Sequence, residues 1–269
     1  MSDSLAPPAP RVLVTRPEAE ALRWVAGLQA AGLDAHALPL ITIAPPVDVE
    51  PVRQAGQRLA DYAAVMFVSS NSVHYFWAQQ PAEVVQAWAQ GRLATRAWSP
   101  GPGTSRALMQ AGLAATQIDA PADEAPQFDS EALWARVQAQ VRPGQRVLIV
   151  RGSDENGQGA GRDWLPEQLR AAGVQVDQLS AYRRVPPQLP APALALVQHA
   201  ASDGSIWLFS SSEAIANLQA QLPGQDWSAA RAVATHPRIA ATARRAGWGV
   251  VCESRPALSA VVASIKSCE

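Results

Sequence analysis

The chain has 269 residues, of which 48% are hydrophobic and 17% charged, and its formal net charge is −1. This length accommodates two domains that each bury a core, and the near-neutral charge gives no reason to expect nucleic acid or an acidic membrane surface as a partner. The two cysteines, Cys252 and Cys268, form neither a metal-binding spacing nor a disulfide framework; they are typical of a reducing cytosol, so we expect a cytoplasmic protein.

The N-terminal stretch and the hydropathy pattern predict neither a targeting nor a membrane segment. Residues 1–11 are rich in proline and lack the basic and apolar regions of a signal peptide, so we expect a loose tail. No apolar run approaches the ~18 residues of a membrane-spanning helix.

Strands and helices alternate from one end of the chain to the other. We expect strands at residues 11–15, 35–43, 65–68, 93–98, 146–150, 174–182, 206–209, 232–235 and 250–252. Helices are expected at residues 18–31, 52–59, 81–90, 163–172, 193–200 and 256–266, with further helices ending near residues 76, 110, 141, 222 and 246. This alternation predicts an α/β fold with parallel sheets and right-handed crossovers.

An internal repeat indicates two copies of one βα-rich unit. The segment 67–70, Phe-Val-Ser-Ser, recurs 141 residues later as 208–211, Leu-Phe-Ser-Ser. Three more pairs follow in the same order at offsets of 135 or 141 residues, among them 12–16 with 147–151. We therefore expect two similar domains with parallel sheets flanked by helices.

Serine-rich turns follow two of the apolar strands. Their hydroxyl and amide side chains can cap a helix, and a helix start offers N–H groups and a positive dipole end to an anion. Capping alone explains these residues about as well as ligand binding does. The residues are Ser69, Ser70 and Asn71 in the first copy and Ser210, Ser211 and Ser212 in the second.

Two glycine-containing loops raise the question of a nucleotide cofactor. The loop with Gly101 and Thr104 lacks the Gly-Lys-Ser/Thr ending of a P-loop, which leaves a plain turn and a ligand contact as alternatives. Glycines 157, 159 and 161 give G-x-G-x-G, a weak fit to dinucleotide binding. We expect no cofactor.

Several other side chains fall where parallel strands end. Arg16, Arg151 and Arg238 each follow a strand and could bind a carboxylate through the guanidinium fork. His236 and Tyr182 also end strands, and for each the alternatives are contact with a ligand and packing within the protein. The histidines share no metal-binding spacing, and the serines lie in no nucleophile elbow.

In these features the chain resembles the uroporphyrinogen-III synthase family from about residue 12 to about residue 265. The motifs are Val-Thr-Arg-Pro from Val14, Phe-Val-Ser-Ser-Asn-Ser-Val from Phe67 and Val-Arg-Gly from Val150. Further motifs are Ser-Glu-Ala-Leu from Ser130, Gly161-Arg162, Ala-Tyr-Arg-Arg from Ala181 and Phe-Ser-Ser-Ser from Phe209. No single motif is specific, but their order and spacing together are.

The resemblance implies two α/β domains joined by two antiparallel linker strands. Residues 1–39 with 188–269 would form the first domain and residues 47–179 the second, with linkers at 40–46 and 180–187. A cleft would lie between the domains, lined by their strand ends. The family is cofactor-independent, and we expect a cytoplasmic monomer with a small-molecule substrate.

The resemblance also implies the reaction and the residues that serve it. The family's enzymes are lyases of haem biosynthesis that cyclise hydroxymethylbilane, a linear tetrapyrrole, with loss of water and inversion of the last ring. Tyr182 matches the tyrosine suspected as the acid. The substrate-binding positions carried over are Thr15, Arg16, Ser69, Ser70, Asn71, Gly101, Thr104, Arg151 and Ser210–Ser212.

The last turn of the expected cleft departs from the family pattern. Many members have Gly-Pro-Thr-Thr there, whereas this chain has Thr235-His236-Pro237-Arg238. We still expect His236 and Arg238 to contact the substrate. The alternative to an enzyme is a non-catalytic two-domain binding protein for a small polyanion.

Overall fold

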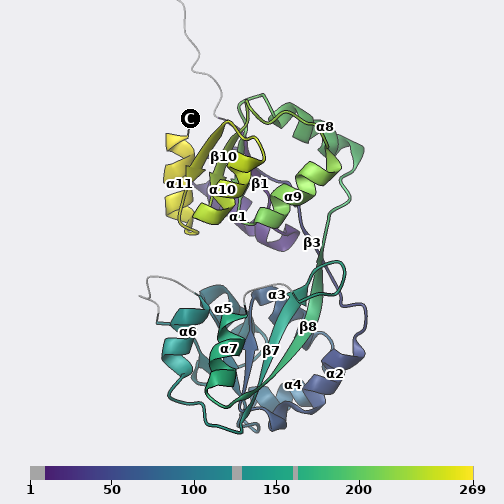
Figure 1. Ribbon diagram of the computed structural model, residues 1–269, viewed down its shortest axis with the longest axis vertical. Helices are drawn as coiled ribbons and strands as arrows, with labels where there is room; N and C mark the ends of the chain where they lie inside the picture. The colour runs from purple at the N-terminus through teal and green to yellow at the C-terminus, as the bar shows by residue number, and fades with distance from the viewer. Residues whose placement is uncertain (1–9, 123–128, 160–162, 269) are drawn as a thin grey trace, which may run out of the picture. The chain divides into compact units, whose positions relative to one another are not determined.

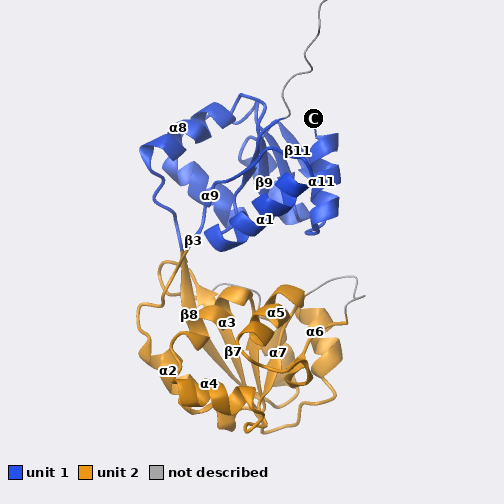
Figure 2. Ribbon diagram, turned by 180° about the vertical axis from the view of Figure 1, so that it is seen from behind, with its two compact units in different colours: residues 1–42, 185–269 blue, residues 43–184 orange. Residues whose placement is uncertain are grey.

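The computed structural model describes residues 10–122, 129–159 and 163–268, and the chain divides into two compact units. Residues 1–42 and 185–269 form unit 1, and residues 43–184 form unit 2 (Figure 2). The chain therefore passes from one unit to the other twice, within or at the end of two strands, β3 (Thr42–Ala44) and β8 (Gln175–Val185). Residues 1–9 of the N-terminal tail and the Gly161-Arg162 motif lie outside the described residues.

Unit 1 contains a five-stranded sheet in the order β11-β10-β9-β1-β2, and each neighbouring pair is parallel. Its strands are β1 (Val12–Val14), β2 (Ala35–Ala37), β9 (Ile206–Phe209), β10 (Arg231–Ala234) and β11 (Val250–Glu253). Its helices are α1 (Glu18–Ala30), α8 (Ala191–Ala200), α9 (Ser212–Gln221), α10 (Pro237–Arg245) and α11 (Leu258–Ser267) (Figure 1).

Both faces of the unit 1 sheet are buried, as a short continuous apolar strand requires. In β9, Ile206 and Leu208 belong to an apolar cluster with residues of α1 and α11. The alternate residues, Trp207 and Phe209, meet Trp248 edge to face on the other side. Strand β9 thus shows the two-residue period of side chains along a strand.

Unit 2 contains a six-stranded sheet in the order β3-β8-β7-β4-β5-β6. The pairs of β4 with β5 and β7, of β5 with β6 and of β7 with β8 are parallel. The remaining strands are β4 (Ala64–Phe67), β5 (Arg96–Trp98), β6 (Ile118–Asp119) and β7 (Arg146–Ser153). The helices are α2 (Glu50–Gln57), α3 (Ser70–Trp77), α4 (Ala82–Ala89), α5 (Pro102–Gln110), α6 (Ser130–Val137) and α7 (Trp164–Ala171), with short 3-10 turns η1 (Leu59–Asp61) and η2 (Ala115–Gln117).

The apolar run that begins at Val65 is a fully buried central strand, as the sequence predicts. Val65 and Phe67 belong to one apolar cluster, whereas Ala64 and Met66 belong to a second. The strand expected at residues 65–68 is therefore confirmed, and it is covered on both faces.

The single strand predicted at residues 35–43 is wrong, because the structure has two short strands there, β2 and β3. Between them the N–H groups of Leu38 and Leu40 donate to the carbonyls of Val14 and Thr15, but Pro39 has no N–H to donate. Leu40 and Ile41 are buried. The chain therefore follows the end of β1 before it enters the second sheet.

The interpretation of the two cysteines as reduced thiols is also wrong, because the structure joins Cys252 and Cys268 in a disulfide. Cys252 lies in β11 and Cys268 follows α11, and the packing of α11 beside the sheet brings them together. A spacing of 16 residues gives no sign of this pairing, since it depends on how a helix and a strand pack.

No helix in the described part of the chain is long and apolar enough to cross a membrane.

We predict that reduction of the Cys252–Cys268 bond lowers stability. The bond closes a loop of 16 residues, and the chain-entropy model assigns such a loop about 3 kcal/mol. Thermal unfolding with and without dithiothreitol measures the difference, and Cys252→Ser should lose the response to the reductant. Equal melting temperatures of the unmodified chain in both conditions would contradict the prediction.

Candidate functional site

The polar residues predicted in unit 2 gather at one edge of its sheet. Strands β8, β7, β4 and β5 are parallel neighbours, so their carboxyl ends point the same way, as Figure 1 shows for β7 and β8. Ser69 follows β4, Gly101 follows β5, Arg151 lies near the end of β7 and Tyr182 lies in β8. In such sheets ligands bind at the carboxyl edge.

Ser69 caps helix α3 in a reciprocal arrangement with Ser72. The Ser72 N–H donates to Ser69 Oγ at 3.2 Å, and the Ser69 N–H donates to Ser72 Oγ at 3.1 Å. Ser70 and Asn71 are the first residues of the helix and are half-buried. The predicted helix start is confirmed, and Ser69 makes the cap.

Tyr182 meets this cap directly. Its Oη lies 3.2 Å from Ser69 Oγ, and its side chain is 3% exposed. The Tyr75 ring packs against the Tyr182 ring with 6.0 Å between the two centroids, and the Tyr75 hydroxyl donates to the Ile43 carbonyl. Ser69 Oγ can donate its proton to Tyr182 while it accepts the Ser72 N–H, which would leave the phenolic proton for a ligand.

A bulge in β8 and a glycine in β7 place the Tyr182 ring. Arg151 pairs with Ser180 but Gly152 pairs with Tyr182, so Ala181 is an extra residue on β8. A Cβ at residue 152 would lie 2.5 Å from the Tyr182 ring. Only a glycine therefore leaves room for this ring. Gly152 belongs to the Val-Arg-Gly motif, but the sequence alone indicates no role for it.

Arg151 already has protein partners. Its side chain is 7% exposed, and its Nη1 donates to Asp163 at 3.1 Å and to Gln178 through a short bond. Neither Asp163 nor Gln178 is among the residues that the sequence analysis singles out. Arg151 thus links β7, β8 and the start of α7 at this edge.

The turn after β5 is held by its own serines. Ser99 donates to the Gly101 carbonyl at 2.8 Å, and Ser105 donates to Ser99 at 3.0 Å. Gly101 is the residue before α5 and has extended backbone that any residue adopts, while Thr104 is buried within that helix. Gly101 and Thr104 thus both belong to the turn and the helix start that follows it, and their contact with a ligand stays a prediction.

In unit 1 the corresponding edge is formed by the ends of β1, β9 and β10. Thr15 follows β1, and its hydroxyl donates to the Leu208 carbonyl at 2.8 Å. Its side chain is buried. The Thr15 proton therefore joins two adjacent strands and is not available to a ligand.

Arg16 lies beside this bond with part of its guanidinium unpaired. Its Nη1 donates to Glu20 at 3.2 Å, and the guanidinium lies 4.5 Å from the centre of the Trp24 ring. Its Nε is buried and has no partner among the described residues. Burial lowers the pKa of Arg16, while Glu20 acts in the opposite direction.

The three serines after β9 differ in their bonding. Ser211 caps α9 by accepting the Glu213 N–H at 3.2 Å, and Ser212 Oγ lies 3.2 Å from the Thr242 hydroxyl that donates to it. Ser210 Oγ is buried without a partner in the described part of the chain. Ser210 is thus the second unpaired polar group at the unit 1 edge.

His236 and Arg238 form the start of α10 and are both exposed. The His236 Nδ1 accepts the Arg238 N–H at 3.0 Å, which places the proton of the neutral ring on Nε2. The predicted position of both residues after a strand is confirmed, the cap made by His236 is a finding of the structure, and contact with a ligand stays a prediction.

Together the two edges offer donors to anions. Each carries helix N-termini after its strands, and helix starts favour negative charge. Among the described residues no group of three or more His, Cys, Asp or Glu side chains could hold a metal ion. Helix starts of this kind can bind carboxylates, and the unit 2 edge also carries a tyrosine hydroxyl.

Comparison with known proteins gives one consistent result. A family model described as uroporphyrinogen-III synthase HemD matches residues 23–263. A uroporphyrinogen-III synthase from Synechococcus elongatus is 30% identical over 222 residues, 81% of this chain and 78% of that protein. One from Chlorobaculum parvum is 29% identical over 181 residues, 66% of this chain and 65% of that protein.

Solved structures support the fold. The Helicobacter pylori uroporphyrinogen-III synthetase structure gives a TM-score of 0.62 at 14% identity, covering 97% of this chain and 100% of the other. A mutant uroporphyrinogen III synthase from Thermus thermophilus gives 0.53 at 16% identity, covering 97% and 98%. Both identities are low, so these likenesses bear on the fold alone.

We predict that Gly152→Ala lowers the free energy of unfolding by about 1–3 kcal/mol, because the added methyl group overlaps the buried Tyr182 ring. The matched control is Gly103→Ala, at the same edge on α5, where an added Cβ meets nothing within 4 Å. The control should be neutral or slightly stabilising. Urea unfolding measures both, and equal stabilities would contradict the predicted role of Gly152.

Proposed function

The chain belongs to the uroporphyrinogen-III synthase family, and we propose that it cyclises hydroxymethylbilane to uroporphyrinogen III in tetrapyrrole biosynthesis. The observation that carries this proposal is the family match across residues 23–263. The strand-edge chemistry of both units is what such a reaction would use, since the substrate is a flexible polycarboxylate that loses a hydroxyl group.

We propose that the two strand edges bind carboxylates of the substrate. In unit 1, the buried and unpaired Arg16 Nε and Ser210 Oγ support this assignment, because a buried polar group without a partner is costly unless a ligand satisfies it. In unit 2, the capped start of α3 offers backbone N–H groups. Binding of carboxylates away from the reacting atoms orients the two ends of the linear substrate for ring closure.

We propose that Tyr182 donates the proton that leaves with the hydroxyl group as water. A phenol is neutral and protonated at pH 7, so it can act as a hydrogen-bond donor and acid. The Ser69 hydroxyl, 3.2 Å from Tyr182 Oη, would donate to that oxygen and turn the phenolic proton toward the substrate.

We propose that the enzyme needs neither a cofactor nor a macromolecular partner. Loss of water and ring closure transfer no electrons to an external acceptor, so the residues suffice without a cofactor. The net charge of −1 gives no basis for a nucleic acid partner. We propose a monomer that acts in the cytoplasm on the basis of the family resemblance alone, because the Cys252–Cys268 disulfide removes the argument from reduced cysteines.

Incubation with hydroxymethylbilane, followed by separation of the type I and type III products, tests the function. The unmodified chain should give the type III isomer. Formation of the type I isomer alone, at the uncatalysed rate, would reject the proposal and favour the non-catalytic polyanion-binding protein.

We predict that Tyr182→Phe lowers kcat by about a hundredfold or more, because general acid catalysis contributes at least that factor. The ring and its packing against Gly152 are kept, so the melting temperature should change little. An unchanged kcat would remove Tyr182 from the acid role and leave the function of the chain intact.

We predict that Arg16→Gln raises KM about ten- to a hundredfold, because a charge-assisted hydrogen bond to a carboxylate is lost. The matched control is Arg23→Gln, which removes the same charge from an exposed position in α1, the helix that begins two residues after Arg16. Steady-state kinetics compare the two. Equal KM values for both variants would contradict a direct contact between Arg16 and the substrate.

A further inference from the structure

Tyr75 packs against the Tyr182 ring and has no role in the site described above. Its ring centre lies 6.0 Å from that of Tyr182, with 31° between the two ring planes, which is the geometry of a packed aromatic pair. The other contacts of Tyr182 are at its hydroxyl end, where Ser69 Oγ lies 3.2 Å from the phenol oxygen and Gly152 leaves space for the ring. Tyr75 therefore adds a contact to the ring itself.

Tyr75 is held in place by both its ring and its hydroxyl. The half-buried ring packs against the apolar cluster that includes Phe76 and Ala181. The hydroxyl donates to the Ile43 carbonyl at 3.2 Å. Burial raises the pKa of Tyr75, so the hydroxyl is protonated at neutral pH and remains a donor. The Tyr75 side chain is thus fixed between α3, which carries it, and β3, which accepts its proton.

The strand that carries Tyr182 is joined to the strand that anchors Tyr75. Strands β3 and β8 are neighbours in the unit 2 sheet, and Arg183 Nε, next to Tyr182 in the chain, donates to the Pro45 carbonyl at 3.0 Å. Tyr75 bonds to β3 through its hydroxyl and packs against β8 through its ring. It therefore connects α3 to both strands.

The plane of a phenol ring decides where its proton can point. Conjugation of the oxygen with the ring keeps the O–H bond close to the ring plane, so the proton has two preferred directions. The torsion that turns the ring has a broad minimum, and a hydrogen bond to the oxygen from Ser69 leaves that torsion free. A second ring packed against Tyr182 restricts the torsion and hence the direction of the O–H bond.

We propose that Tyr75 is a positioning residue, which fixes the plane of the Tyr182 ring and thereby directs the phenolic proton toward the substrate. Tyr75 acts through Tyr182 and makes no substrate contact of its own. The inference rests on the acid role proposed above for Tyr182. It adds a residue that lies outside the motifs by which the chain resembles its family.

A double-mutant cycle on kcat tests whether Tyr75 acts through Tyr182. Tyr75→Leu removes the ring contact and should lower kcat about tenfold while KM stays within about twofold. Tyr75→Phe keeps the ring and should retain at least about a third of kcat. In the Tyr182→Phe background, Tyr75→Leu should change kcat less than about twofold, because the proton that it directs is absent. The same tenfold loss in both backgrounds would overturn the proposal.

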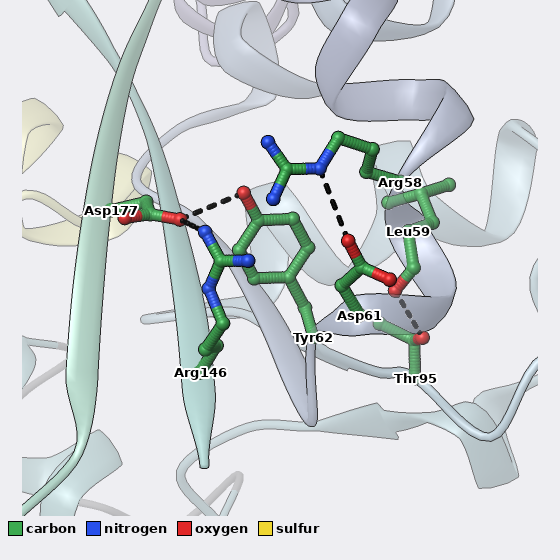
Figure 3. Close-up of polar contacts among 7 residues, drawn as sticks. All are labelled: Arg58, Leu59, Asp61, Tyr62, Thr95, Arg146 and Asp177. Carbon is green, nitrogen blue, oxygen red and sulfur yellow. Dashed lines mark hydrogen bonds and ion pairs between the residues drawn. The ribbon is translucent and has the colours of Figure 1, made fainter. Parts of the chain in front are cut away.

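Tyr62 provides the matched control, since it is a second tyrosine of unit 2 whose hydroxyl is bonded. It donates to Asp177 Oδ2 at 2.9 Å, and the Arg146 guanidinium lies 5.2 Å from its ring centre (Figure 3). These contacts lie at the amino ends of the strands, because Tyr62 precedes β4 and Asp177 is near the start of β8. Tyr62→Leu should lower the melting temperature but leave kcat within about twofold. A tenfold loss of kcat in this variant would show that kcat follows stability, and would reject the role of Tyr75.

NMR of protein with carbon-13-labelled tyrosine tests the placement without the reaction. The chain has three tyrosines, so comparison with Tyr182→Phe assigns the Tyr182 signals. Tyr75→Leu should raise the flip rate of the Tyr182 ring about tenfold, whereas Tyr62→Leu should leave it unchanged. An unchanged flip rate in Tyr75→Leu would overturn the inference. Failure of the unmodified chain to form the type III isomer would instead reject the proposed function, and the flip rate would still decide whether Tyr75 holds the ring.

Discussion

Parallel pairing of neighbouring strands is the constraint on which the arrangement of functional groups depends. Strands β1, β4 and β9 are short apolar segments that are buried along their whole length, so their side chains serve the core. The polar residues that follow are then carried to a single edge, where each turn leads into a helix start. Ser69 and Tyr182 are far apart in the sequence. They meet because β4, β7 and β8 lie side by side in the same direction.

Within that frame, one backbone irregularity decides where the tyrosine points. Side chains alternate between the faces of a strand, so a shift of one residue in register moves every later side chain to the other face. The extra Ala181 in β8 makes such a shift and sets Tyr182 opposite Gly152. Because Gly152 has no side chain, the phenol ring fits in the space beside it. Bulge, glycine and serine cap act together to fix one hydroxyl group.

The sequence predicts the parts of this structure that depend on local pattern. The apolar run at Val65 and the cap at Ser69 follow from residue types within a few positions, and both are confirmed. Contacts between distant segments are different. The Ser69–Tyr182 contact, the Arg151–Gln178 bond and the Cys252–Cys268 disulfide each depend on the register or packing of two elements. A single sequence carries no signal for the bulge at Ala181.

Polar residues at a strand edge therefore fall into two groups that residue type alone does not separate. Thr15 donates to a neighbouring strand and Arg151 bonds Asp163 and Gln178, so both hold the edge together. Arg16 and Ser210 keep buried polar atoms without a partner. Leaving such atoms unpaired costs stability, and for that reason they support the proposal that this edge binds a ligand.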